Sequence, residues 1–164
     1  MPMREMSLAR PAEWIDRIET GLETALQEIF SVMFNEKAEV VDHAFDLDSP
    51  HISSVVGFTG RLSGMLALHF SVDMACKMAS RLLDMAVTHP DENVRDAVGE
   101  LSNVLAGGLK KQLSNTDNMF KISIPTVIVG MEYSMHPPAN SRQVWLGVNT
   151  GTCRFRIQIV LEQE

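Results

Sequence analysis

The chain has 164 residues, the size of one ordinary domain, and 45% of them are hydrophobic. That fraction is enough for a core that needs no metal or disulfide to hold it together. Acidic residues outnumber basic residues by 21 to 14, which gives a formal net charge of −7. This charge argues against nucleic acid or an anionic membrane as the main partner and leaves room for a partner that presents cations.

Cys76, Cys153 and the five histidines show no spacing typical of a metal site. We expect both thiols to be reduced and buried, His69 to be structural, and Trp14 and Trp145 to be buried in the core or an interface. The N-terminus has no apolar core like that of a signal peptide, and no apolar run approaches the ~20 residues of a membrane span. These features predict a cytoplasmic protein with no metal of its own.

Residues 1–11 form a predicted flexible lead-in, and residues 12–164 form a predicted single domain. A helix is predicted over about 12–34, because apolar residues recur there at helical spacing. A short strand is expected at 38–44. The apolar positions of the helix are Ile15, Ile18, Leu22, Ala25, Leu26, Ile29, Val32 and Met33.

A β-hairpin is predicted next, with strands at 52–58 and 65–70 joined by a glycine-bearing turn. A second helix is predicted at 73–85. A third is predicted at about 91–113, where Pro90 suits the first helical position.

Strands resume at 122–129, where Pro125 predicts a sheet edge or a bend. A second hairpin follows, with strands at 144–149 and 154–161. Apolar and polar residues alternate in the last strand, so one of its faces is expected to be wet. Its polar positions are Arg154, Arg156 and Gln158.

The element order divides the chain into two halves, each with a helix and three strands. Residues 55–60 resemble residues 144–151, which suggests an internal duplication, although two unrelated hairpins could share this much. In a duplicated chain the first and third helices are counterparts. Strands clustered between helices predict an α+β domain, with helices packed on one face of an antiparallel or mixed sheet.

The third predicted helix carries a polar strip opposite its apolar side. At about 100° per residue, a strip roughly 60° wide contains Asp96, Glu100, Asn103 and Gly107. It points to solvent or to a partner. A glycine inside a helix costs roughly 1 kcal/mol relative to alanine, so Gly107 calls for an explanation. A bare patch beside Glu100 and Asn103 would let another surface approach closely.

Other residues of this helix bear on that interpretation. Gly108 lies toward the apolar side, where close packing of the helix on the sheet would explain it. Gly99 and Ala106 are expected to add to the flatness of the strip. Lys110 and Lys111 lie near the helix end, where cations are favoured, and are expected to cap it. The alternative is that the strip is simply an exposed helix face of poor propensity.

Glu100-Leu-Ser-Asn103, followed by Gly107, resembles the Glu-x-x-Asn signature of the chemotaxis phosphatases of the CheC/CheX family. Residues 122–130 and 58–70 also resemble segments of that family, and together the similarity covers most of the chain. The resemblance implies a CheC/CheX-like α+β fold. Its features would be about six mostly antiparallel strands, about three helices, and a pseudo-two-fold helix-plus-three-strand repeat.

Some family members carry the signature on both related helices. Here the first helix offers only Glu28-Ile-Phe-Ser31, and serine has no carboxamide. The resemblance therefore implies one site per subunit of a homodimer.

The resemblance also implies a function: a phosphatase that removes the aspartyl phosphate of a CheY-type response-regulator receiver domain in chemotaxis or two-component signalling. Asn103 would hold a water in line with the phosphorus, and Glu100 would pair with a lysine of the receiver. Gly107 would lie at the contact, and Asp96 would serve docking or solubility. The receiver would bring its own Mg²⁺, so no cofactor is expected in this chain.

Two alternatives stay open. One is a non-catalytic CheX-like dimeric module that binds a receiver domain or another signalling partner, because a framework can outlast its chemistry. The other is a flagellar switch component related to the same family. It is less favoured because no appended domain is expected.

Overall fold

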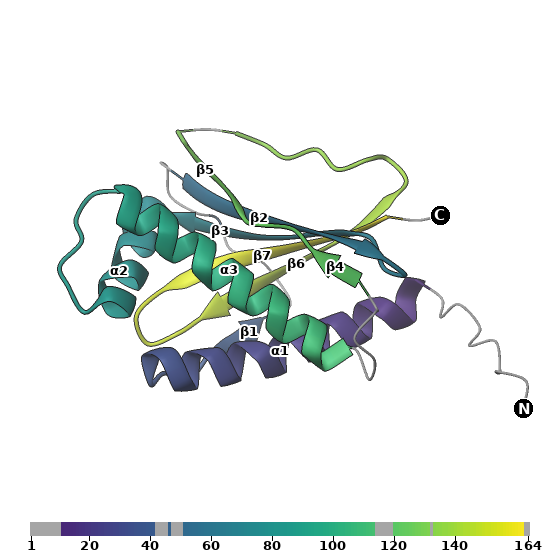
Figure 1. The fold of residues 1–164 in the computed structure, drawn as a ribbon, viewed down its shortest axis with the longest axis horizontal. Coiled ribbons are helices and arrows are strands. Elements are labelled where there is room, and N and C mark those ends of the chain that lie inside the picture. The colour runs from purple at the N-terminus through teal and green to yellow at the C-terminus, as the bar shows by residue number, and fades with distance from the viewer. Residues whose placement is uncertain (1–10, 42–45, 47–50, 114–119, 132, 163–164) are drawn as a thin grey trace, which may run out of the picture.

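A computed structural model describes residues 11–41, 46, 51–113, 120–131 and 133–162 of the chain. Three helices lie on one side of a seven-stranded sheet (Figure 1). The α+β class expected from the sequence is confirmed.

The three helices form where apolar residues recur at helical spacing. Of the predicted lead-in, only the last residue is described, and it is the first residue of α1. Proline is favoured at that position because the first helical N–H has no partner inside the helix. The helices are α1 (Pro11–Phe34), α2 (Val72–Leu83) and α3 (Glu92–Leu113).

Side-chain caps set the starts of α2 and α3. The Ser71 hydroxyl accepts a hydrogen bond from the Met74 N–H at 3.2 Å. Asp91 does the same for α3, accepting from the Val94 N–H at 3.2 Å. Both satisfy an N–H that has no partner inside its helix. The prediction that Pro90 opens α3 is therefore wrong, because Asp91 is the cap and Pro90 precedes it.

All strand pairs in the sheet are antiparallel, in the order β1-β6-β7-β3-β2-β4, with β5 also paired to β2. Of the strand predicted at 38–44, the first part forms β1, and 42–44 lie outside the described residues. The strands are β1 (Glu39–Val41), β2 (His51–Gly60), β3 (Gly64–Ser71), β4 (Phe120–Ile122), β5 (Thr126–Gly130), β6 (Ser141–Asn149) and β7 (Arg154–Glu162).

Seven strands appear instead of about six because the run around Pro125 is split into β4 and β5. Both pair with the same edge of β2. Between them, the Ser123 N–H donates to the Gly57 carbonyl at 2.8 Å, and the Ser123 hydroxyl accepts from the Gly57 N–H at 2.9 Å. Ile124 is left 88% exposed. The bend and sheet edge predicted at the proline are confirmed.

The sheet order has the symmetry expected of a duplicated chain. β3 and β7 pair at the centre, their hairpin partners β2 and β6 flank them, and β1 and β4/β5 close the two edges. The first strand of each half thus pairs with the other half, at the outer edge of the sheet. α1 and α3 hold equivalent places in the two halves, which agrees with the predicted repeat.

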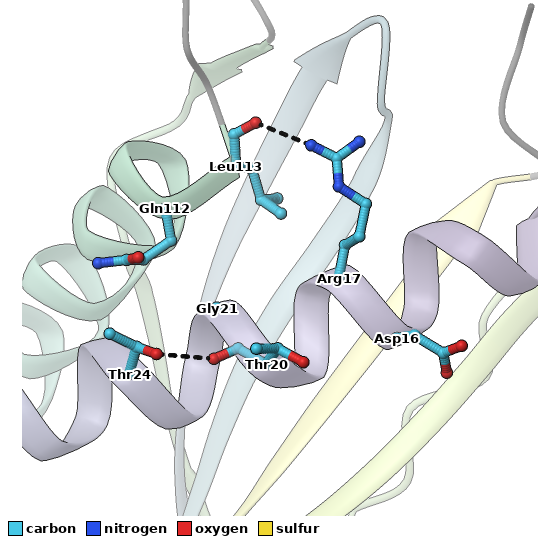
Figure 2. A pocket seen from close by; sticks show the side chains of 7 residues that line it. All are labelled: Asp16, Arg17, Thr20, Gly21, Thr24, Gln112 and Leu113. Carbon is cyan, nitrogen blue, oxygen red and sulfur yellow. Dashed lines mark hydrogen bonds between the residues drawn. The ribbon is translucent and has the colours of Figure 1, made fainter.

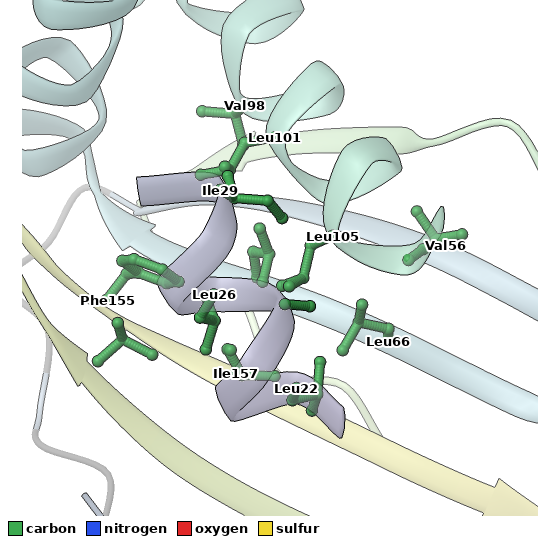
Figure 3. Packing of buried hydrophobic residues seen from close by; sticks show 14 of the residues in the cluster. Leu22, Leu26, Ile29, Val56, Leu66, Val98, Leu101, Leu105, Phe155 and Ile157 are labelled. Atoms are coloured by element: carbon green, nitrogen blue, oxygen red, sulfur yellow. The ribbon is translucent and has the colours of Figure 1, made fainter. Parts of the chain in front are cut away.

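The core lies between the sheet and the helices. Figure 3 shows Leu26 of α1 beside Phe155 and Ile157 of β7, and Leu101 of α3 beside Ile29 of α1, all within one cluster. Burying each such side chain contributes about 1.5–3 kcal/mol. One predicted core position is wrong: Val32 is 85% exposed.

The alternation of apolar and polar residues in β7 predicted that the opposite face of the sheet is exposed to water. The centre of that face is buried instead. Residues 133–140 pass over this face on their way from β5 to β6, on the side away from α1 (Figure 1). Gln158 is 0% exposed and His69 is 6% exposed. Arg154 alone keeps the predicted exposure fully, and Arg156 is half-buried. A long connection, which strand periodicity cannot reveal, covers the polar side of β7.

Both cysteines are buried, as expected, and His69 is buried as well. Burial raises the pKa of both thiols, that of Cys153 to about 11, which leaves them protonated and unreactive near neutral pH. Within the described ranges, no helix is long and apolar enough to cross a bilayer.

The start of β3 depends on a glycine. A Cβ at Gly64 would lie 1.9 Å from the carbonyl oxygen of Val160 on β7, a backbone atom that cannot move without breaking strand pairing. We predict that Gly64→Ala lowers the free energy of unfolding by roughly 2–3 kcal/mol, measured by urea denaturation. A loss below about 0.5 kcal/mol would show that the β3–β7 contact is not this close.

Candidate functional site

All four residues of the predicted polar strip are exposed on α3: Asp96, Glu100, Asn103 and Gly107. The predicted exposure is confirmed, and the roles of these residues remain predictions. We call this row the α3 ridge. The opposite side of the helix is buried against the sheet and α1. Its fully buried members include Val94, Val98, Leu101 and Leu105.

The two adjacent glycines of α3 have different surroundings. A Cβ at Gly107 would meet no described atom within 4 Å, so that point of the α3 ridge is open among the described residues. A Cβ at Gly108 would lie 3.1 Å from the Ala25 Cβ on α1. Gly108 is therefore explained by close packing of helix on helix, and the predicted contact with the sheet is wrong. Packing within the described part of the chain gives no reason for Gly107.

Gly99 and Ala106 do not widen the bare strip, contrary to expectation. Both are buried. A Cβ at Gly99 would lie 3.5 Å from a methyl of Val127 and 3.9 Å from Pro125. β5 therefore passes beneath the first half of α3, and the exposed surface around Glu100 is narrower than the helix wheel indicated.

The residue before Asn103 anchors this turn of the helix. The Ser102 side chain is 0% exposed, and its hydroxyl lies 2.6 Å from the Ser54 hydroxyl on β2 and 2.9 Å from the Gly99 carbonyl oxygen, to which it donates. Sequence analysis missed Ser54 and Ser102. The available signal was that Ser102 falls on the apolar side of the wheel, where a polar residue needs a buried partner.

Glu100 and Asn103 thus project from a turn held from below at two points. Gly99 precedes Glu100 and touches β5, and Ser102 precedes Asn103 and bonds to β2. Residues three apart on a helix are neighbours on its surface. The ridge offers a carboxylate and a carboxamide side by side, on a rigid support and open to another macromolecule. A carboxamide can donate and accept hydrogen bonds at once.

The described residues contain no group of three His, Cys, Asp or Glu side chains placed to hold a metal ion. A hollow of about 330 Å³ lies between α1 and the C-terminal end of α3 (Figure 2). There Arg17 donates to the Leu113 carbonyl oxygen at 3.3 Å and so caps α3. Capping was predicted from Lys110 and Lys111, and the Arg17 contact was not foreseen. Neither Glu100 nor Asn103 lines this hollow.

The counterpart turn on α1 is also exposed. Glu28 and Ser31 lie at the surface and border a hollow of about 570 Å³ that Lys37 also lines. The position equivalent to the amide is a hydroxyl, as the sequence showed. α1 therefore presents no carboxylate–carboxamide pair at this turn.

Solved structures share this architecture. A CheC-like superfamily protein from Shewanella sp. PV-4 superimposes with a TM-score of 0.76 at 21% identity, over 90% of this chain and 98% of that one. A chain of the CheX–CheY–BeF3–Mg²⁺ complex from Borrelia burgdorferi superimposes with a TM-score of 0.70 at 16% identity, over 92% of this chain and 98% of that one. The fold is therefore that of the CheC-like proteins.

The family model described as chemotaxis phosphatase CheX matches residues 52–149, which include the whole α3 ridge. The chain belongs to this family. The CheY-P phosphatase CheX of Thermotoga maritima is 34% identical over 98 residues. That alignment spans 58% of this chain and 61% of the Thermotoga protein.

The two glycines of α3 should respond oppositely to alanine. We predict that Gly107→Ala raises the free energy of unfolding by up to about 1 kcal/mol, because it adds helix propensity without a new contact. Gly108→Ala is the matched control. Its Cβ would crowd Ala25 at 3.1 Å, so it should gain less or lose stability. Urea denaturation of both variants tests this, and a destabilising Gly107→Ala would show that the ridge is not bare there.

Proposed function

We propose that this chain is a phosphatase that hydrolyses the aspartyl phosphate of a response-regulator receiver domain of the CheY type. The observation that carries the proposal is the exposed pair of Glu100 and Asn103 on α3. It occurs in a chain of the CheX family that is 34% identical to a CheY-P phosphatase. A protein of the same fold was solved in a complex with CheY, which supports the choice of partner.

Asn103 acts by placing a water molecule. Hydrolysis of an acyl phosphate needs a nucleophile in line with the bond that breaks and stabilisation of charge on the phosphoryl oxygens. The amide oxygen accepts a hydrogen bond from the water and the amide N–H donates to an oxygen nearby, which fixes the water's position. Because Ser102 anchors the adjacent backbone, Asn103 reaches the receiver from a fixed base.

Glu100 acts in docking. It lies one turn before Asn103 and, as a carboxylate, pairs with a lysine of the receiver, which sets the register of the two proteins. Asp96 extends the acidic end of the same ridge. Gly107 lets the receiver surface come close to the helix backbone, since no described residue lies within 4 Å of the position a Cβ would take.

In this proposal the metal belongs to the receiver. Mg²⁺ bound there neutralises charge on the phosphoryl group, and this chain adds only the amide and the carboxylate. A cytoplasmic location follows from the same proposal, because the two buried cysteines remain free thiols, as suits a reducing compartment.

Kinetic measurements can distinguish the catalytic role proposed for Asn103 from the docking role proposed for Glu100. We predict that Asn103→Ala lowers the rate constant for dephosphorylation at saturating receiver by about 10²-fold, because the water loses its orientation. Glu100→Gln should mainly weaken binding of the phosphorylated receiver. The measurement is loss of phosphate from a ³²P-labelled CheY-type receiver.

Gln112→Ala is the matched control, because Gln112 carries an exposed carboxamide on the same helix but lies on the side toward α1, off the ridge. Its rate should equal that of the wild type. Equal rates for Asn103→Ala and wild type would rule out the catalytic role. Tight binding of the phosphorylated receiver by a wild-type chain that releases no phosphate would favour the non-catalytic binding module.

We also propose that the chain forms a homodimer through the free edge of β5. Among the described strands, β5 pairs only with β2, so its other edge is open to a further strand. Apolar side chains are exposed along this edge, which is unusual for a surface strand. They are Ile124, Ile128, Val129 and Met131.

A charge on this edge should separate the subunits. We predict that the wild type has twice the chain mass in sedimentation equilibrium and that Ile128→Lys shifts it toward the monomer, because a buried lysine would lack a partner. Val32→Lys is the control, since Val32 is an exposed valine on α1, 85% accessible. A monomeric wild type, or an Ile128→Lys dimer as stable as the wild type, would contradict a β5 interface.

A further inference from the structure

The face of the sheet opposite the helices contains a cavity that the proposed phosphatase chemistry does not use. Its volume is about 230 Å³, and it lies between the sheet and residues 133–140. Drug-sized ligands occupy roughly 300–1,000 Å³, so this cavity suits a smaller molecule. Its lining includes His69, Tyr133, Met135, Trp145, Arg156 and Gln158.

Most polar groups of this cavity are already paired in a row across four strands. Gln158 donates to the Gln143 amide oxygen at 3.1 Å, so its own oxygen faces His69 Nε2, 3.0 Å away, and accepts from it. His69 Nδ1 must then accept from the Ser53 hydroxyl at 2.6 Å. Ser53 in turn accepts from the Tyr133 hydroxyl. This row pins Tyr133 to the sheet and leaves these groups no need for a ligand.

His69 is uncharged in this arrangement. Burial, together with the nearby charge of Arg156, lowers the pKa of its imidazole to about 4, although the hydrogen bond to Gln158 acts in the opposite direction. The imidazole is therefore neutral at physiological pH, in agreement with the acceptor role of Nδ1. The cavity thus keeps its positive charge on Arg156.

Arg156 carries the positive charge of this cavity. Its guanidinium carbon lies 4.9 Å from the centre of the Trp145 ring, and its Nε is closed to water, with no described atom accepting a hydrogen bond from it. The described lining residues include no Asp or Glu to pair with this cation. A half-buried charge is costly unless it is paired, so the site favours an anion.

We propose that this cavity binds a small organic carboxylate that carries an apolar body. The carboxylate pairs with the Arg156 guanidinium, because planar carboxylates suit that planar group. The apolar part lies among Tyr133, Met135 and Trp145. In a chain of net charge −7, a local cation with no described acidic neighbour selects a ligand by its charge. The site lies across the sheet from the α3 ridge and does not depend on the phosphatase proposal.

The wild-type protein can be tested directly, because its two tryptophans report on different places. Trp145 lines the cavity, whereas Trp14 lies on α1 beside Arg17. Benzoate, added as the probe, should shift the indole N–H signal of Trp145 in ¹H–¹⁵N spectra to saturation, with a dissociation constant of about 1 mM or lower. The Trp14 signal, assigned from the spectrum of Trp14→Phe, should stay in place.

Benzamide has the shape of benzoate without its charge, and it should bind at least about tenfold more weakly if a charge-assisted bond to Arg156 holds the ligand. This comparison needs no variant of the protein. The proposal is overturned if benzoate gives no saturable Trp145 shift, or if benzamide binds as well as benzoate.

Two arginine variants test whether the charge that holds benzoate is that of Arg156. Arg156→Met should weaken benzoate binding at least about tenfold, whereas Arg142→Met, which removes an exposed arginine from β6, should leave it within about twofold. If Arg156→Met does not fold, Arg156→Lys keeps the charge without the planar guanidinium and should weaken binding severalfold. Equal affinities for the Arg156 and Arg142 variants would overturn the site.

Discussion

The contact between the hydroxyls of Ser54 and Ser102, 2.6 Å apart, joins the helix that carries the α3 ridge to β2, next to the central strands of the sheet. Both side chains are inaccessible to water. Ser102 also donates to the Gly99 carbonyl oxygen, so the hydroxyl that depends on this contact is that of Ser54. Losing Ser102 would leave the Ser54 hydroxyl without this partner, at about 1–3 kcal/mol. The directional bond adds to the packing of α3 in fixing the rotation of the helix. The direction in which Glu100 and Asn103 point follows from that rotation.

The same strand serves both faces of the sheet. Ser54 points toward α3, and its neighbour Ser53 points the other way, into the row that holds Tyr133 and His69. Successive residues of a strand alternate between faces, so one dipeptide of β2 fastens the α3 ridge on one side and the segment 133–140 on the other. β5, which passes beneath Gly99, pairs with this part of β2. A ligand under the segment 133–140 and a receiver on α3 would therefore contact elements that are bonded to opposite faces of the same strand, β2.

Helical periodicity alone predicted the α3 ridge correctly, because a residue's side of a helix depends on a fixed angle per residue. Burial of Gly99 and Gln158 depends instead on segments distant in sequence, β5 and residues 133–140, which no local pattern places. The exposure of Val32 was not predicted for a related reason. Val32 lies at the edge of the apolar arc of α1, where the neighbouring elements decide whether a side chain is buried. The resemblance to the CheC/CheX family supplied the roles of Glu100 and Asn103, which periodicity could not.

Gly107 and Gly108 show how a structure separates two causes that a sequence leaves together. Both glycines carry the same penalty of roughly 1 kcal/mol in a helix. For Gly108 the close approach of Ala25 on α1 offsets that penalty, since a larger residue would force the two helices apart. Among the described residues nothing offsets it for Gly107, one turn from Asn103 on an open surface. In the proposed function the receiver accounts for this glycine, because its surface would come close enough to the helix backbone for even a methyl group to matter.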